Sequence, residues 1–491
     1  MRLLLVQPDA PAGVGFRTVA LPEPLHLEMV AAMVPEHDVR ILDMRVDHRL
    51  EAVLQSFGPE IVAVTALTPE VYAAQQVLQQ VKCFSAEIFT IVGGHHATLV
   101  PKDFFLPQVD AVALGEAEVM FRELVEAVTK RRGLSGVPNL IWQNGEGLFI
   151  RNASSERRVN LGSLPLPCRD LTESYRNEYF FLFDKPDTSV ATSRGCPFRC
   201  KFCSVHEFYR GSINQMTPAR VLSEIRAVST DHITFVDDNF LMNCRREDTL
   251  ADLIKSEGIH KRFSMECRAD SVVRHPELVA KWVDIGLYAV LLGLEGGGDK
   301  MLKDVNKSCT VETNDQAIRI LQENGVIIWG AFIVDPDWTD EDFKLLREYV
   351  GRRQITHTQF TILTPLPGTE LYRDRQEELL TDDYGCFDTL HAVLPTRLPR
   401  EKFYQNFADL YRQRDIGPYY ELVQAGKMTI EDCRRGKSML DALATWERYA
   451  ERDPVLGRKS RHGIDRLPCS PLLETSYPTG AGRNLRPPAP R

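Results

Sequence analysis

The sequence lacks any apolar run near the roughly 20 residues that a membrane-spanning helix needs. It is also not basic: the formal net charge of -9 argues against a dedicated nucleic-acid binder, which usually carries a basic stripe. Small-molecule or lipid substrates fit this composition better. The apolar run at the start ends at Gln7 and Pro8 and is too short for the core of a signal peptide, so we expect a cytoplasmic protein.

Closely spaced cysteines are scarce as well. Of the 11 cysteines, the only close group is Cys196, Cys200 and Cys203, and an odd count in a long chain does not resemble a secreted disulfide framework. We therefore expect reduced, intracellular thiols. A chain of 491 residues is longer than one typical domain, so several domains are expected.

Residues 1–134 alternate short apolar runs with helical patterns, which predicts a doubly wound α/β domain. Its expected strands are 2–6, 38–42, 61–65, 88–92 and 111–114. Ligands of such domains bind beyond the carboxyl ends of the strands, which directs attention to Gln7, Asp43, Thr65 and the Gly-Gly run 93–98. Residues 135–188 contain several prolines and are expected to form an irregular connector.

Residues 189–375 predict a second α/β unit, a (β/α)6 partial barrel. Its expected strands are 189–192, 233–237, 263–267, 289–293, 326–333 and 358–363. Barrel active sites lie at the carboxyl ends of the strands, where Asp238, Glu266, Arg268 and Glu295 stand. Residues 376–465 predict a helical C-terminal domain packed against the barrel, and residues 466–491 predict a disordered tail.

The three close cysteines follow the first expected barrel strand with C-x3-C-x2-C spacing. Three thiolates at this spacing can hold three irons of a 4Fe-4S cluster and leave the fourth iron open to a substrate or cofactor. A zinc knuckle is the alternative, but it needs a fourth Cys or His at short spacing, and only His206 lies nearby. The spacing therefore predicts a cluster bound by Cys196, Cys200 and Cys203.

This motif resembles the cluster loop of the radical S-adenosylmethionine (SAM) superfamily. The resemblance implies that SAM binds the open iron and that an electron, from a donor such as a flavodoxin or ferredoxin, cleaves it to a 5'-deoxyadenosyl radical. That radical can remove hydrogen from an inert carbon. Arginine and carboxylate side chains suit the charged and hydroxyl groups of SAM. By resemblance, Arg268, Glu295 and Asp238 are the expected SAM contacts, with a salt bridge at the barrel mouth as the alternative for each.

Residues 1 to about 130, with the run 93–98 and the stretch Leu114-Gly-Glu116-Ala-Glu118, resemble the cobalamin-binding domain that precedes the radical core in one large class of these enzymes. The expected cobalamin contacts are Thr65, Gly93, Gly94 and Thr98, and a tight turn is the alternative for the glycines. Cobalamin domains with a histidine beneath cobalt carry an Asp-x-His-x-x-Gly loop, and the stretch after Asp43 has no matching histidine. We therefore expect no histidine ligand, with His48, His95 and His96 in surface or hydrogen-bonding roles.

The same resemblance implies a C-methyltransferase in which methylcobalamin delivers a methyl group to the substrate radical and a second SAM restores it. The layout of the chain, with the stretches 21–25 and 391–396, is similar to hopanoid C-3 methylases, which implies a hopanoid substrate and peripheral membrane contact. Methylation, cyclisation or oxidation of a tetrapyrrole or another natural product is the alternative. Tyr384 and the segment 387–396, with His391, are expected either to line the substrate cavity or to have a packing role.

Overall fold

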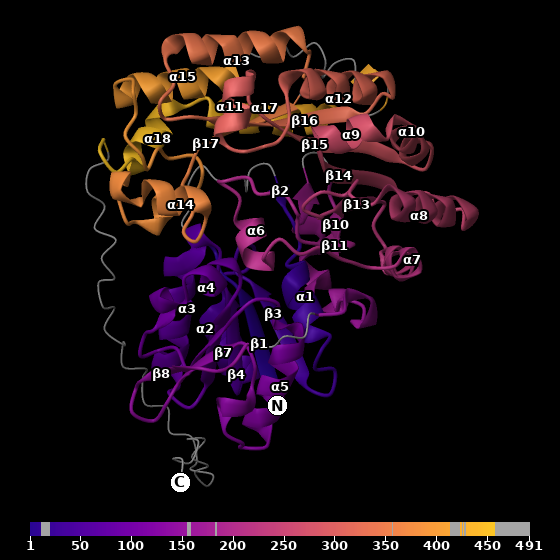
Figure 1. Ribbon diagram of the computed structural model, residues 1–491. Helices are drawn as coiled ribbons and strands as arrows, with labels where there is room; N and C mark the ends of the chain where they lie inside the picture. The colour runs from indigo at the N-terminus through magenta and orange to yellow at the C-terminus, as the bar shows by residue number, and fades with distance from the viewer. Residues whose placement is uncertain are drawn as a thin grey trace.

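Two mainly parallel β-sheets, one in each half of the chain, organise the protein (Figure 1). The computed structural model describes residues 1–10, 20–154, 159–181, 184–355, 357–412, 423–424, 426 and 429–456. In Figure 1 the N-terminal unit lies below the C-terminal unit, and the short helix α6 (Ser204–Tyr209) lies between them. No helix in this described part of the chain is both long and apolar enough to cross a bilayer.

The N-terminal sheet has the strand order β3-β1-β4-β5-β6-β7-β8, and its first five strands are parallel. These five confirm the predicted doubly wound domain: β1 (Arg2–Gln7), β3 (Asp38–Asp43), β4 (Ile61–Thr65), β5 (Phe89–Gly93) and β6 (Ala111–Ala113). Leu3 and Leu5 of β1 face one core while Leu4 and Val6 face the other, because successive side chains alternate across a sheet. Two helices cover each face: α1 (Leu25–Ala31) with α5 (Ala117–Thr129), and α2 (Leu50–Phe57) with α3 (Val71–Phe84).

The prediction of an irregular connector is wrong for residues 140–151. Strands β7 (Leu140–Gln143) and β8 (Phe149–Arg151) pair antiparallel with β6 and with each other, so the N-terminal sheet continues past residue 134. Both strands are short and are flanked by Pro138 and the glycines of a tight turn, which read as loop signals in the sequence. The remainder of the segment, including the 3-10 helix η6 (Arg169–Glu178), leads to the barrel.

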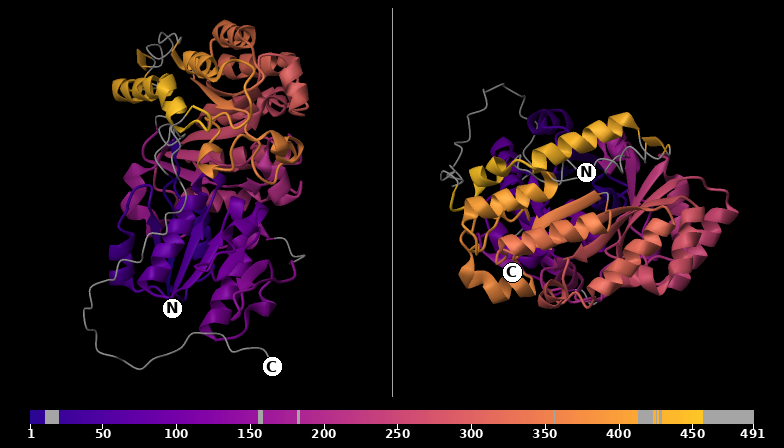
Figure 2. Two further views of the ribbon diagram at one scale, coloured as in Figure 1. Left: turned by 90° about the vertical axis from the view of Figure 1, so that its left-hand side faces the viewer. Right: turned by 90° about the horizontal axis from the view of Figure 1, so that it is seen from above.

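The C-terminal sheet confirms the predicted partial barrel. Its six parallel strands follow one another in chain order: β10 (Asp187–Val190), β13 (His232–Phe235), β14 (Arg262–Arg268), β15 (Leu287–Glu295), β16 (Ile327–Val334) and β17 (His357–Ile362). Helices connect the strands along their outer side (Figure 2): α7 (Pro218–Ala227), α8 (Cys244–Ser256), α9 (Ala269–Arg274), α10 (Pro276–Asp284), α11 (Asp299–Asp304), α12 (Val311–Glu323) and α13 (Asp340–Arg352).

The edge strand β17 is covered by the C-terminal helices. The Tyr411 hydroxyl of α15 (Arg400–Arg412) accepts a hydrogen bond from the Phe360 amide at 2.9 Å and donates one to the Phe360 carbonyl at 2.8 Å. Helices α17 (Ile430–Leu443) and α18 (Trp446–Arg452) pack against α15. This cover matters because an open edge strand presents unpaired backbone groups. The predicted disordered tail lies outside the described residues.

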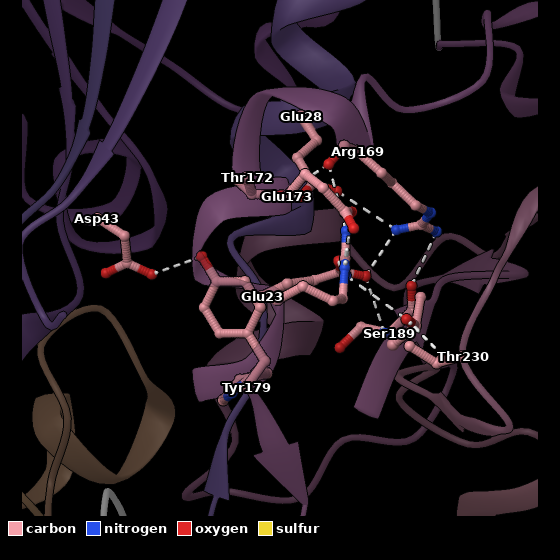
Figure 3. Close-up of polar contacts among 12 residues, drawn as sticks. Glu23, Glu28, Asp43, Arg169, Thr172, Glu173, Tyr179, Ser189 and Thr230 are labelled. Atoms are coloured by element: carbon pink, nitrogen blue, oxygen red, sulfur yellow. Dashed lines mark hydrogen bonds and ion pairs between the residues drawn. The ribbon is translucent and has the colours of Figure 1, made fainter. Parts of the chain in front are cut away.

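A buried polar network joins the two units beside α1 (Figure 3). Glu23 accepts hydrogen bonds from the Ser189 amide of β10 at 2.9 Å and from Arg169 at 2.6 Å, and it also pairs with Arg176. Arg169 in turn reaches Glu224 of α7 at 2.7 Å. Because buried charges are costly unless they are paired, this network favours one placement of α1 between the N-terminal sheet and the first barrel strand.

Candidate functional site

The cysteine loop is fixed at its start by two carboxylates that directly follow the next barrel strand, β13. Strand β11 (Ser193–Arg194) pairs with β12 (Asn214–Gln215), and α6 begins directly after Cys203. Asp237 accepts hydrogen bonds from the Thr192 amide at 3.0 Å and its hydroxyl at 2.7 Å, and it also bonds Ser193. Asp238 accepts one from the Gly195 amide at 2.8 Å. The structure therefore places Asp238 beside the cysteine loop.

Gly195 permits the turn that leads to the first cysteine. Its φ is +87°, a region that favours glycine, and a Cβ atom at this position would lie 2.0 Å from the Ser212 carbonyl oxygen. No side chain fits there without displacement of the backbone. The close approach of these two segments thus requires a glycine at position 195.

The three cysteines share one loop, in which the Cys203 amide donates to the Cys200 carbonyl at 3.0 Å. Burial raises the pKa of all three thiols, to about 12 for Cys203, so their thiolates need nearby positive charge. Within the described ranges, no three Cys, His, Asp or Glu side chains converge as a single metal ion would require. A 4Fe-4S cluster makes no such demand, because each cysteine binds a different iron, and three thiols on one loop fit it.

Arg268, at the end of β14, packs against this loop. Its guanidinium carbon lies 3.5 Å from the centre of the Phe198 ring, and Nη1 lies 3.9 Å from the Cys200 sulfur. Nη2 donates to the Lys307 carbonyl at 2.6 Å, and Nε donates to Asp270 at 2.8 Å. Arg268 therefore lies beside the cysteine loop, where its charge favours the thiolate forms of Cys196 and Cys200, and the part it plays in SAM binding stays a prediction.

Glu295, at the end of β15, forms an ion pair with Lys307, and these two residues are 6% and 7% exposed. Burial acts to lower the pKa of Lys307, but Glu295 and Cys200 act against burial and the pKa is raised overall. The observed contact is the barrel-mouth salt bridge that the sequence left open for Glu295. Sequence reasoning missed Lys307, because it lies in a loop 12 residues further on and belongs to no motif.

Glu266 presents a carboxyl group to the interior of the barrel. Its neighbours Met265 and Cys267 pack in the outer core, so the alternation of β14 turns Glu266 inward, where it is exposed. The protein around the barrel interior desolvates the Glu266 carboxyl group, and this desolvation, followed by the charge of Asp238, raises its pKa to about 7. The charge of Lys307 opposes this shift. Its position at the barrel mouth was noted in the sequence, whereas its unusual proton affinity was not.

A cavity of about 440 Å³ lies between the two units. One wall consists of the carboxyl ends of β1, β4, β5 and β6 with the first turn of α1, and the opposite wall includes Arg194, Phe208 and Tyr209 from the cysteine loop and α6. Strand β1 lies between β3 and β4, so this edge is the topological switch point at which doubly wound sheets bind ligands. A group bound here would touch both units.

Of the predicted cobalamin contacts, Thr65, Gly93 and Gly94 line this cavity. Thr98 does not: its hydroxyl donates to the Gly94 carbonyl at 2.8 Å and accepts from the Gly115 amide at 2.9 Å. Thr98 therefore holds two glycine turns together, while Gly115 itself lines the cavity. A sequence pattern cannot distinguish a threonine that faces a ligand from one that faces its own turn.

The histidines near this edge differ in their surroundings. His95 lines the cavity, stacks on Phe208 with ring centroids 4.4 Å apart, and has an Nε2 atom buried without a hydrogen-bond partner among the described residues. His96 is buried and bonds Asp103 at 2.9 Å, whereas the His48 side chain is 66% exposed. A buried ring nitrogen without a partner beside the cavity fits a bound group with amide donors, which a corrin ring carries. His26, which the sequence reasoning did not consider, also lines the cavity.

The segment near residue 390 packs inside the protein. The Tyr384 hydroxyl donates to Asp103 at 2.7 Å, and His391 is fully buried with Nδ1 2.9 Å from Asp388. For Tyr384 and His391, packing is the alternative that is observed. Pro395 and Thr396 do line a second cavity, of about 710 Å³, beyond β15 and β16.

Two family models match the chain. The "Radical SAM superfamily" model matches residues 190–350, which include the cysteine loop, and the "B12 binding domain" model matches residues 14–125, which include the N-terminal wall of the cavity. The first model implies a 4Fe-4S cluster and SAM, and the second implies cobalamin. The two matched ranges fall in different units of the structure, the first in the partial barrel and the second in the N-terminal α/β unit.

Similar proteins include several methyltransferases. The hopanoid C-3 methylase of Methylococcus capsulatus is 32% identical over 397 residues, which cover 78% of this chain and 74% of that protein. An uncharacterised methyltransferase of Pyrococcus horikoshii is 30% identical, with 80% and 88% covered. The anaerobic magnesium-protoporphyrin IX monomethyl ester cyclase of Rubrivivax gelatinosus is 26% identical, with 73% and 66% covered.

Solved structures show the same fold. The cobalamin-dependent SAM radical enzyme OxsB aligns with a TM-score of 0.69 at 16% identity, over 90% of this chain and 71% of that one. The radical SAM methyltransferase TsrM from Kitasatospora setae aligns with a TM-score of 0.61 at 17% identity, over 77% and 76%. With both family models and a relative above 30% identity, the chain belongs to the cobalamin-dependent radical SAM methyltransferases, whose cofactors are a 4Fe-4S cluster, SAM and cobalamin.

Proposed function

We propose that this enzyme methylates an unactivated carbon of a hopanoid lipid, at C-3. The observation that carries the proposal is the 32% identity to a hopanoid C-3 methylase over most of both chains. A cavity shared by the cysteine loop and the cobalamin-binding unit supports a reaction that uses both units. When bound, the cluster and SAM would supply hydrogen abstraction, and cobalamin would supply the methyl group.

The residues assigned to each group form part of this proposal. Cys196, Cys200 and Cys203 hold the cluster, and Arg268, whose Nη1 lies 3.9 Å from the Cys200 sulfur, favours the thiolates of Cys196 and Cys200. Glu295 and Asp238 present carboxylates on the same side of the barrel, within electrostatic reach of Glu266. Thr65, Gly93 and Gly94 contact cobalamin from the N-terminal side, with Thr98 behind the turn.

Tetrapyrrole chemistry is the second candidate function. It is favoured by relatives such as the cyclase of Rubrivivax gelatinosus and a bacteriochlorophyllide d C-12(1)-methyltransferase of Chlorobaculum tepidum, which is 24% identical. The two functions differ in their products, because a methylated triterpene and an altered macrocycle have different masses and absorption spectra. Lipid and pigment extracts from one culture therefore distinguish them.

The remaining assignments concern the setting of the reaction. A flavodoxin or ferredoxin in the cytoplasm would supply the electron, and a hopanoid substrate would bring the enzyme to a membrane surface. Reduction of the cluster by purified flavodoxin, and sedimentation with hopanoid-containing vesicles, test these two assignments separately.

Expression in a host that makes hopanoids, with cobalamin supplied, tests the proposed function. Extracted lipids are compared by mass spectrometry with those from a Cys200→Ala strain, and a Cys433→Ala strain provides a matched control outside the cluster loop. A methylated hopanoid in the wild type and the control, but absent in Cys200→Ala, is the expected result. An unchanged lipid profile from protein shown to contain both cofactors would refute the hopanoid assignment.

A further inference from the structure

The first turn of α1 brings an imidazole to the cavity between the two units. His26 is exposed, whereas Leu25 and Leu27 on either side of it are 7% and 5% exposed. His26 therefore faces away from the core of the N-terminal unit, and its side chain forms part of the cavity wall. The network around Glu23 holds the chain just before this helix and so places His26 beside the cavity.

The charged groups around His26 are already paired. Arg45 bonds Asp43 at 2.8 Å, and Arg194 bonds Glu116 at 2.7 Å as well as Glu118. On the same wall, Gln7 donates to Glu70 at 2.9 Å. Within the described ranges no hydrogen bond involves the His26 ring, so its nitrogen lone pair is available to a bound group.

The ring is also in the right protonation state for a metal ligand. Dense protein around the cavity and, next, the Arg45 guanidinium lower the pKa of His26 to about 4, although Asp43 and Glu118 oppose this shift. The imidazole is therefore neutral near pH 7, as coordination requires. His95 differs, because its ring is stacked on Phe208 and bonds the backbone of Ser204.

We propose that His26 is the axial ligand that the protein supplies to the cobalt of bound cobalamin. This revises the expectation of no histidine ligand, which rested on the stretch after Asp43. Imidazole nitrogen is a common ligand of transition metals. Of the two histidines that line this cavity, His26 is the one whose ring makes no hydrogen bond or ring stack among the described residues. The proposal depends on cobalamin binding in this cavity and not on the identity of the substrate.

Electron paramagnetic resonance of the Co(II) form of the cobalamin-loaded protein tests the proposal. The protein is prepared with histidine labelled with nitrogen-15, while the cobalamin remains unlabelled. A histidine ligand then splits the cobalt lines into doublets, the cofactor's own base would give triplets, and a missing nitrogen ligand gives unsplit lines. Doublets are expected, and either triplets or unsplit lines would overturn the proposal.

Variants then assign the histidine. His26→Ala, with cobalamin content checked by absorbance, should lose the doublet splitting, and His26→Gln provides a second variant that keeps a polar side chain. His48→Ala is the matched control on the surface and should keep the doublets, as should His95→Ala. Doublets that persist in both His26 variants would show that another histidine binds cobalt and would overturn the assignment. Lipid methylation is not needed for this readout, so its outcome is independent of the hopanoid experiment.

Discussion

Arg194 lies two residues before the first cluster cysteine and donates a 2.7 Å hydrogen bond to Glu116 of the opposite unit. Its second nitrogen pairs with Glu118, and the three side chains are 13%, 19% and 5% exposed. The cysteine loop is thus attached to the cobalamin-binding unit through a fork of two carboxylates. Arginine suits this role because its planar guanidinium can bond two acceptors at once.

Replacement of Arg194 should weaken the attachment between the units. Arg194→Met removes the cation that faces the Glu116 and Glu118 carboxylates, and loss of one member of a buried ion pair costs about 3–5 kcal/mol. Urea unfolding should show this loss of stability, and cobalamin affinity should fall. Arg199→Met, an exposed substitution in the same loop, is the matched control. Unchanged unfolding of Arg194→Met would contradict the role of the fork.

Gly195 should be required for cluster assembly. Gly195→Ala places a Cβ atom 2.0 Å from the Ser212 carbonyl oxygen at a φ of +87°, so the loop must move. The variant should contain much less iron and sulfide after reconstitution than the wild type. Gly145→Ala, where a Cβ atom meets nothing within 4 Å, should reach wild-type iron content. Equal iron content in the two variants would refute the strained-turn explanation.

Lys307 should matter for both stability and SAM binding. Lys307→Met leaves the Glu295 carboxylate in a nearly buried site without its cation, at a cost of about 3–5 kcal/mol. Adding Glu295→Gln removes that charge and should restore much of the stability without restoring SAM binding. The check is to measure the free energy of unfolding of Lys307→Met, Glu295→Gln and the double variant, and to measure their SAM binding by calorimetry. Additive losses of stability would show that the two residues are not coupled.

Glu266 should make stability depend on pH. Its pKa is about 7 in the folded protein against 4.5 ordinarily, so the unfolded chain releases this proton first as the pH rises. The folded state therefore loses stability between pH 4.5 and about 7, and the loss persists above that window. Glu266→Gln should equal the wild type at the acidic end and exceed its stability above pH 7, as measured by urea midpoints. The exposed substitution Glu146→Gln should show no such difference, and a parallel pH profile for Glu266→Gln would disprove the shift.

The sequence predicted the strands well and the contacts between strand ends poorly. Buried parallel strands are continuous apolar runs, so stretches such as 61–65 and 326–333 are recognisable from composition alone. Strands β7 and β8 were not predicted, because each is short and lies next to turn residues. Position at a strand end placed Arg268 and Glu295 correctly at the barrel mouth.

The partners of those residues could not be predicted. Lys307 and the Arg194 fork depend on loops that meet only in three dimensions. Thr98 matched a ligand-binding pattern but bonds its own turn. The sequence pattern considered for a cobalt ligand lies after Asp43 and does not include His26, which stands in the first turn of α1.

The most direct test of methyl transfer to a hopanoid uses the reconstituted enzyme, SAM with a deuterated methyl group, a reductant and a hopanoid substrate. Mass spectrometry of the lipid product should show the deuterated methyl group on the triterpene, with 5'-deoxyadenosine formed alongside and neither product made by Cys200→Ala. A lipid that is oxidised or cyclised without gaining the label would contradict methyl transfer by this enzyme.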